Sequence, residues 1–446
     1  MKQRLLVIFI ASLVSLHGQS FFSPLIGDLP AISSTRQIGV GFSSWGSSGS
    51  AAALFTNPAL IALSAGKASF YFGMDGNSIN EKRSFPVQDS FGDFLADNTY
   101  VVNSNWYPGV QVGLNYHLLD RLHLGLAFQQ SVSRNFRYEE EVRGSVYGQY
   151  NRDPLVGYHR LSSTGNIARL ALGSSYQVLK QLRLAAALEI NLPNANEDRY
   201  EIEVIKSSVN LAAAETISYQ SKPTIATLKN VILGMSYDVN RHLSFAAAYK
   251  FQYNTSVENG LFHLVYDTTS LLPVFNIDST RQIKSADYAR PSELRLSLKY
   301  EPQNIIKTVF YLEAVFQPWS KSKVEYEYRN EGLPAAFPID LYTSSYPLRD
   351  VLKIHVAVEH IFFSDVPFRM GFYHDPNPID PGMDRNWFTA GTGYLWGNLA
   401  LDVSGAFSKC DYDYPDLFPI AGEERNKFDT VRENYLTGTL TLKYSF

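Results

Sequence analysis

Charged side chains stand at every second position in several segments of this chain, and they are the residues best suited to chemistry. Guanidinium and ammonium groups of this kind can hold the carboxylate head of an amphiphilic molecule. They can equally form ion pairs with acidic neighbours, which would fill and stiffen the interior of the fold. We expect ion pairing to be the commoner role for any single residue. The candidate set consists of Arg169, Arg183, Lys250, Arg295, Lys299, Lys353 and Arg369, together with Glu189, Glu359 and Asp402.

Two long segments contain many apolar side chains although turns and polar residues surround them. Exposed apolar surface usually marks a binding site, so we predict a capture surface for an apolar ligand in segment 255–292. Packing against neighbouring loops is the alternative. The residues proposed for this capture loop are Phe262, Leu264, Leu271, Leu272 and Phe275. A second candidate is segment 317–350, which contains Trp319, Leu333, Phe337, Leu341 and Tyr342.

Two acidic clusters offer oxygen ligands of the kind that Ca²⁺ prefers, but neither has the spacing of a defined calcium loop. One cluster comprises Asp375, Asp380 and Asp384, and the other comprises Asp411, Asp413 and Asp416. Solvated loops are the simpler interpretation, and we predict no metal site.

Enzyme motifs are missing from the sequence. The nine histidines include no His-Glu-x-x-His pair, and Cys410 is the single cysteine, so no zinc site is indicated. The run Gly46-Ser47-Ser48-Gly49 is one residue too short for a nucleophile elbow. We therefore predict a protein that is not an enzyme and needs no cofactor. The net charge of −4 gives no reason to expect nucleic acid as a partner.

The elements that must position these residues are β-strands, because apolar residues alternate strictly with polar ones. The clearest example is the final segment, in which apolar residues or glycine occupy each even position from Leu436 to Phe446. Only a strand with two different faces explains a period of two. The same pattern predicts fourteen strands, near residues 67–75, 107–118, 122–136, 168–178, 181–192, 229–239, 242–254, 293–301, 305–316, 351–362, 366–374, 386–396, 398–408 and 436–446.

Short connections between these strands alternate with long ones. The long ones, expected to be loops, are 76–106, 137–167, 193–228, 255–292, 317–350 and 409–435. Short turns at one end and long loops at the other are typical of outer-membrane barrels, and an even strand count returns both termini to the short-turn end. The 28 Tyr and 28 Phe are numerous enough to form aromatic girdles. The sequence therefore predicts an all-β fold, a fourteen-stranded antiparallel transmembrane barrel over residues 67–446.

Two segments precede the barrel. Residues 1–20 have a basic start, the apolar run 5–16 and small residues at positions 18 and 20, which indicate a cleaved secretory signal peptide. The run is too short to cross a bilayer as a helix. Residues 21–66 are rich in Ser, Gly and Ala, which suit close packing, so we predict an N-terminal hatch inside the lumen. A loose extension is the alternative.

The residues just before the first strand, Phe55-Thr56-Asn57-Pro58-Ala59-Leu60, resemble the Asn-Pro-Ala motif of the FadL family of outer-membrane transporters. A second stretch, from Arg369 through Asp384-Arg385 to Tyr394, resembles a strand–loop–strand of that family. The resemblance makes Asn57, Pro58 and Ala59 hatch residues, with a purely structural role as the alternative. It implies location in the outer membrane, contact with its lipid, and passive passage of fatty acids or hydrocarbons with lateral release.

The same resemblance leaves another function open. Some members serve as secretion shuttles, so a barrel component of a protein secretion or assembly system with no small-molecule cargo is the alternative. A general porin is disfavoured because a hatch would block a wide aqueous channel. The terminal Phe446 resembles the ending that outer-membrane insertion machinery recognises, so this machinery is an expected partner during assembly.

Overall fold

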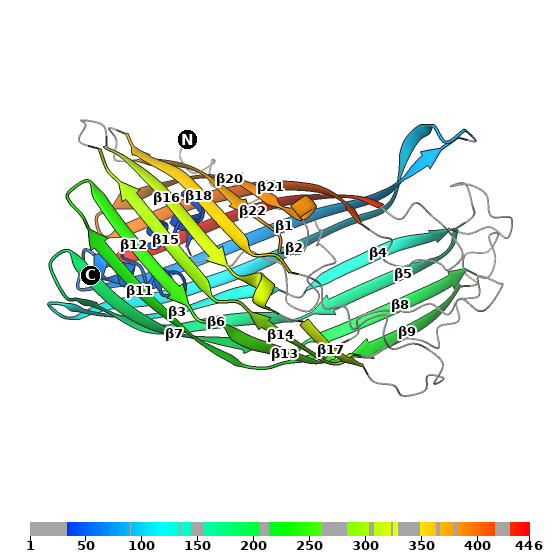
Figure 1. Cartoon of the computed structure of the whole chain (residues 1–446), viewed down its shortest axis with the longest axis horizontal. Coiled ribbons are helices and arrows are strands. Elements are labelled where there is room, and N and C mark those ends of the chain that lie inside the picture. Colours follow the sequence, from blue (N-terminus) through cyan, green and yellow to red (C-terminus); the bar gives the residue numbers. More distant parts are fainter. Residues whose placement is uncertain are drawn as a thin grey trace.

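The computed structural model describes residues 34–446 except 90, 134, 144–154, 206–213, 261–282, 303–306, 323, 329–347, 363–365, 379–380 and 415–428. Fourteen antiparallel strands close into one barrel, with β1 paired to β22 (Figure 1). In order around the wall they are β1 (Ala68–Gln88), β2 (Phe94–Leu119), β3 (Leu122–Ser133), β6 (Asn166–Gln177), β7 (Leu182–Pro193), β11 (Leu228–Asp238), β12 (Leu243–Lys250), β15 (Glu293–Tyr300), β16 (Lys307–Gln317), β18 (Val351–Ile361), β19 (Pro367–Asp375), β20 (Arg385–Trp396), β21 (Leu399–Tyr414) and β22 (Asp429–Ser445).

Each of the fourteen strands corresponds to one of the predicted strands, so the predicted fold class is confirmed. The expectation that segment 76–106 is a loop was wrong, because β1 and β2 continue through it as a paired hairpin. Strands β21 and β22 likewise extend into segment 409–435. A strand that has left the membrane needs no apolar outward face, so the period-two signal disappears while the hydrogen-bonded ladder continues.

Four more of the predicted loops also contain strands. One four-stranded sheet comprises β4 (Phe136–Arg143), β5 (Leu155–Thr164), β8 (Glu197–Ile205) and β9 (Ala214–Ser221). A second comprises β10 (Thr224–Ile225), β13 (Tyr253–Gly260), β14 (Ile283–Arg290) and β17 (Val324–Tyr328). Polar cross-strand contacts join the first sheet, for example the ion pairs of Arg160 with Glu139 and Glu203. Figure 1 shows both sheets toward the end of the barrel opposite the C-terminus.

The outer surface of the barrel carries an apolar band with aromatic edges. Near the end that carries the termini, tyrosines face outward on six strands: Tyr116, Tyr176, Tyr237, Tyr300, Tyr394 and Tyr444. On β2, exposed Trp106 precedes Tyr116 by ten positions. At ~3.3 Å per residue and a tilt of ~40°, the two rings bracket a band about 25 Å tall, which matches the hydrocarbon thickness that such barrels cross. Among the described residues, no helix is long and apolar enough to span a membrane.

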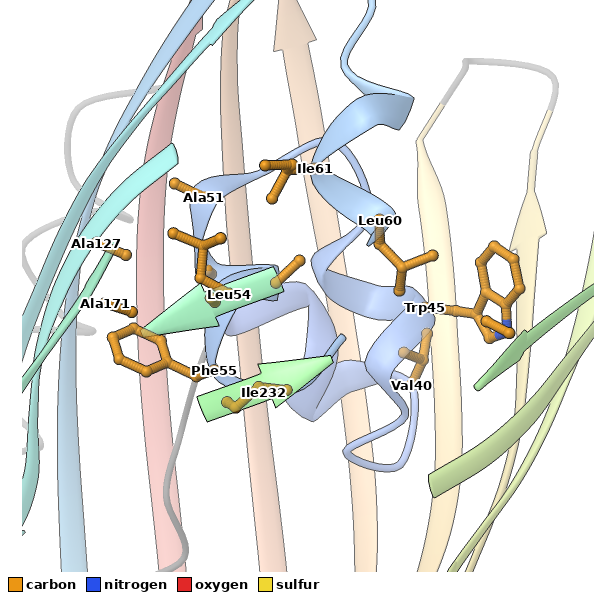
Figure 2. Close-up of a cluster of buried hydrophobic side chains, with 14 of the residues drawn as sticks. Val40, Trp45, Ala51, Leu54, Phe55, Leu60, Ile61, Ala127, Ala171 and Ile232 are labelled. Carbon is orange, nitrogen blue, oxygen red and sulfur yellow. The ribbon is translucent and has the colours of Figure 1, made fainter. Parts of the chain in front are cut away.

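Residues 34–64, which we call the hatch, lie inside the barrel (Figure 2). They form α2 (Thr35–Gly39) and three 3-10 helices, η1 (Ser44–Ser47), η2 (Ala51–Phe55) and η3 (Pro58–Leu63). Figure 2 shows Leu54 and Phe55 directed toward Ala127 and Ala171 of the wall. Wall positions facing the hatch are small, so its backbone can approach closely; they include Gly113, Gly125, Ala127, Ala171, Gly173, Ala187, Gly234 and Ala246.

Candidate functional site

The Asn57-Pro58-Ala59 motif fastens one end of the hatch to the wall. The Asn57 side-chain oxygen caps η3 by accepting from the backbone N–H of Ala59 at 3.0 Å. Its amide nitrogen donates to the backbone carbonyls of Met235 and Ala247, at 3.2 and 3.1 Å. Pro58 occupies the first turn of η3, where a missing N–H costs nothing. The motif therefore begins η3 and also docks it onto β11 and β12.

Gly234 of β11 makes this docking possible, and replacing it with leucine should displace the hatch. A Cβ atom at position 234 would stand 2.4 Å from Asn57 Oδ1 and 3.0 Å from the backbone nitrogen of Ala59. We expect Gly234→Leu to lower the temperature at which the folded barrel loses its heat-modifiable migration in gel electrophoresis. The matched control is Gly438→Leu, because position 438 faces outward with nothing within 4 Å of the added atom. If both variants lost their folded migration at the same temperature, this role of Gly234 would be contradicted.

The other end of the hatch is held against β18, β19 and β20 through the Gly41–Phe42 turn. His355 Nδ1 donates to the carbonyl of Gly41 at 2.7 Å, and the Gly41 N–H donates to Thr389 Oγ1 at 3.1 Å. A Cβ at Gly371 would lie 2.3 Å from the Gly41 nitrogen, so only glycine permits this approach. Gly41 has φ +64°, a backbone conformation that glycine adopts without strain.

A buried carboxylate holds the middle of the hatch. Glu313 of β16 is fully buried and accepts from the Ser44 backbone N–H at 2.8 Å and from the Ser44 hydroxyl at 2.5 Å. It also forms an ion pair with Arg295 of β15. The start of η1 is thus tied to the wall by hydrogen bonds that water cannot reach.

Arg36 of α2 shares one wall carboxylate with Arg369. Glu359 accepts from Arg36 Nε at 3.0 Å and Nη2 at 2.8 Å, and from Arg369 Nε at 2.5 Å. Arg369 also donates to Asp402 at 2.6 Å. Two of the candidate lumen charges, Glu359 and Arg369, therefore act on the hatch itself.

The remaining candidate charges each have a partner as well. Lys250 contacts Glu189 at 3.0 Å, and Arg169 reaches the same carboxylate at 3.5 Å. Arg295 contacts Glu293 as well as Glu313. The other pairs are Arg183 with Asp238, Lys299 with Glu301, and Lys353 with Asp375. The structure therefore places all these residues on the polar face, where each has a counter-charge.

Aromatic side chains form a continuous apolar column on the wall opposite the Asn57 end of the hatch. It begins at Phe42 and Ile38 of the hatch and ends near Met383, in the connection between β19 and β20 on the side away from the termini. Trp387 lies near its centre, with ring centroids 5.8 Å from Phe42 and 5.6 Å from Tyr435. The column consists of Ile38, Phe42, Ile79, Tyr107, Tyr373, Met383, Trp387, Ala406, Cys410, Tyr412, Val431 and Tyr435. Charged groups border the column: Arg385 lies over the ring of Tyr435 and pairs with Glu433, which accepts hydrogen bonds from the hydroxyls of Tyr412 and Tyr435.

Several sequence predictions fall outside the described residues. They include every residue of the proposed capture loop, namely Phe262, Leu264, Leu271, Leu272 and Phe275. They also include four residues of the second candidate segment, Leu333, Phe337, Leu341 and Tyr342, and one residue of each acidic cluster, Asp380 and Asp416. Asp384 is paired with Arg349. Within the described ranges, no three His, Cys, Asp or Glu side chains come together so as to hold a metal ion.

The aromatic column is the feature that sequence reasoning missed. Its strand residues occupy lumen-facing positions, where the alternation pattern predicts hydrophilic side chains. Trp387 and Tyr435 at such positions were a usable signal, since a large aromatic on a lumen-facing phase must be packed against something. What they pack against is contributed by segments far apart in the sequence.

Comparison with solved structures identifies proteins of the same shape. A FadL homologue from Pseudomonas aeruginosa matches with a TM-score of 0.60 and 13% identity, covering 94% of this chain and 99% of that one. The toluene transporter TodX from Pseudomonas putida matches with a TM-score of 0.54 and 14% identity, covering 94% and 100%. No family model and no curated protein matches the sequence. At identities this low the likeness is one of fold, and by its fold the chain is a barrel of the FadL type.

Proposed function

We propose that this protein is an outer-membrane channel for hydrophobic small molecules, which enter from outside, follow the aromatic column to the hatch and leave sideways into lipid. The termini and short turns would then face the periplasm. The observation that carries the proposal is the aromatic column itself, which runs from near Met383 to Phe42 of the hatch inside the barrel. The FadL homologue and the toluene transporter of the same fold support it.

A break in the wall between β2 and β3 supports lateral release. Among the described residues, the β2–β3 ladder runs from Leu119–Leu122 only as far as Gln111–Gln129, whereas β2 stays paired with β1 up to Phe94. The register of β3 against β6 shifts between Gln130 and Val132. Residues 106–110 of β2 include Pro108, which has no N–H to donate. Because Val110 faces outward within the apolar band and Trp106 faces outward at its edge, this break lies at the height of the lipid.

Asparagine side chains bridge the wall above the break. Asn105 accepts from the backbone N–H of Arg137 at 3.1 Å and donates to its carbonyl at 3.2 Å. Asn103 accepts from the Glu139 N–H at 3.2 Å. Strand β4 is thus joined to β2 by side chains rather than by a backbone ladder, a seam that can widen more easily. An apolar molecule gains about 25 cal/mol per Å² of surface by leaving water for lipid, so a sideways exit is favourable.

Uptake by whole cells tests both parts of the proposal. A deletion strain should lose uptake of a radiolabelled apolar probe, such as toluene or a long-chain fatty acid, and the wild-type gene should restore it. In a Cys410→Ser background, a short bis-methanethiosulfonate crosslinker should join Asn105→Cys to Arg137→Cys and staple the seam. We expect crosslinking to lower uptake several-fold and a reductant to restore it, because the stapled seam limits how far the break can widen.

The control staple is Gly405→Cys with Gly438→Cys, which joins two cross-strand partners that are already paired. This staple should leave uptake unchanged. If the deletion strain takes up the probes as well as wild type, transport is not the function. If deletion abolishes uptake but the seam staple has no effect, transport stands and release through this break does not.

A further inference from the structure

Phe42 adopts an unusual backbone conformation at the point where the hatch meets the aromatic column. Its φ is +62°, in the left-handed region that bulky residues rarely enter, and it directly follows Gly41 at +64°. Two hydrogen bonds to Gln37 hold the turn: the Phe42 N–H donates to the Gln37 carbonyl at 2.8 Å, and Gln37 Nε2 donates to the Phe42 carbonyl at 3.1 Å. Backbone strain of this kind persists only where surrounding contacts enforce it, and it is often found at functional sites.

The ring of Phe42 is the contact that matters, because it inserts into a group of aromatic residues on the wall. Its centroid lies 5.3 Å from that of Tyr373 and 5.8 Å from that of Trp387, in tilted and edge-on arrangements. Trp387 in turn packs on Tyr435. We call Tyr373, Trp387 and Tyr435 the aromatic box; all three are buried. These are the separations and angles that aromatic rings prefer, so the box suits any six-membered aromatic ring and not only that of the hatch.

The box also contains two buried hydrogen-bond donors without a partner among the described residues. Trp387 and Ser408 stand directly opposite each other on β20 and β21. Neither the indole N–H of Trp387 nor the hydroxyl of Ser408 has a hydrogen-bond partner within the described part of the chain, although both side chains are almost completely buried. A buried donor without an acceptor is unfavourable, and an oxygen atom on a ligand would correct it. The wall thus provides an aromatic surface together with two buried donors at facing positions of neighbouring strands.

We propose that Phe42 is a placeholder for a ligand: its ring occupies a site that binds a single aromatic ring carrying an oxygen acceptor, such as an aromatic alcohol. The ligand binds by displacing Phe42, which releases the left-handed turn and so couples occupation of the box to movement of the hatch. The inference rests on the proposed function and adds to it a substrate class and the residues that select it.

Binding of benzyl alcohol to the full-length mature barrel in lipid nanodiscs tests the proposal, with empty nanodiscs subtracted. Phe42→Ala removes the competing ring, so we expect this variant to bind benzyl alcohol roughly tenfold more tightly than wild type. Adding Trp387→Ala should abolish the gain. The matched control is Phe55→Ala, which deletes another buried hatch ring, one that contacts Arg169 on the opposite wall. This control should leave the affinity at the wild-type value.

Other outcomes would overturn the proposal. Unchanged or weaker binding by a folded Phe42→Ala barrel would show that the box is not a ligand site. If that variant does not fold, Phe42→Gly carries the same expectation, because glycine tolerates the positive φ. If Phe42→Ala raised the affinity for toluene as much as the affinity for benzyl alcohol, the two donors would have no role in selecting the ligand. If cells take up apolar probes but Phe42→Ala does not change the affinity for benzyl alcohol, the placeholder proposal is wrong and the transport proposal stands. If cells show no uptake but the variant binds benzyl alcohol more tightly, the transport proposal is wrong and the binding site stands.

Discussion

Replacing Glu313 with leucine is expected to destabilise the hatch-filled barrel by about 3–5 kcal/mol, the cost of removing one partner from a buried charged network. The substitution would leave Arg295 with one fewer carboxylate and the Ser44 N–H without its acceptor, while the Ser44 hydroxyl would keep only Ser297 Oγ at 3.4 Å. Because Glu313 is fully buried, water cannot take its place. The measurement is the urea midpoint for unfolding of the purified barrel in lipid vesicles.

An exposed pair provides the comparison for Glu313. Glu301 contacts Lys299 at 3.2 Å but has a half-exposed side chain, so Glu301→Leu should change the unfolding free energy by less than about 1 kcal/mol. Glu313→Gln should fall between the two, since an amide oxygen can still accept from Ser44 while the ion pair is lost. A Glu313→Leu barrel as stable as Glu301→Leu would mean that the hatch does not depend on this carboxylate.

Replacing Glu359 with leucine should release α2 and make the closed barrel conduct ions. Glu359 is the only carboxylate that Arg36 contacts in the described part of the chain, and the next partner, the Tyr311 hydroxyl, lies 3.4 Å away. Arg369 would keep Asp402 and stay on the wall. A hydrogen bond to a charged group contributes about 1.5–3 kcal/mol, so losing this contact should raise the open population about 10- to 150-fold.

Single-channel recording in planar bilayers measures this effect. Wild-type barrels should stay closed, whereas Glu359→Leu and Arg36→Met should both show frequent openings, because each removes one side of the same contact. Lys409→Met is the control, since its ion pair with Asp411 is exposed and involves no hatch residue. Openings as rare in both variants as in Lys409→Met would show that the Arg36–Glu359 contact does not keep the hatch closed.

The arrangement of the hatch could be inferred only in part from the sequence. The Asn57-Pro58-Ala59 run has the side-chain cap and first-turn proline of a short helix, and that is how it folds. Its docking on β11 and β12 could not be inferred, because Gly234 is one of many glycines until the wall closes around Asn57. The charged residues show the same division: alternation placed Arg369 in the lumen, but only closure showed that it shares Glu359 with Arg36.

By itself the sequence determined the fourteen membrane strands and the face that each residue occupies. Lipid demands an apolar outer face and a fully paired backbone, and these two demands impose a period of two that is visible in any short segment. Outside the membrane neither requirement applies, so the strands of the two outer sheets show no period of two in the sequence. These strands are β4, β5, β8 and β9 in one sheet and β10, β13, β14 and β17 in the other. Tertiary structure alone decided which inward residues meet. Tyr373, Trp387 and Tyr435 come from β19, β20 and β22 and form the aromatic box through the ladders that join these strands, and Phe42 reaches the box only because the barrel encloses residues 34–64.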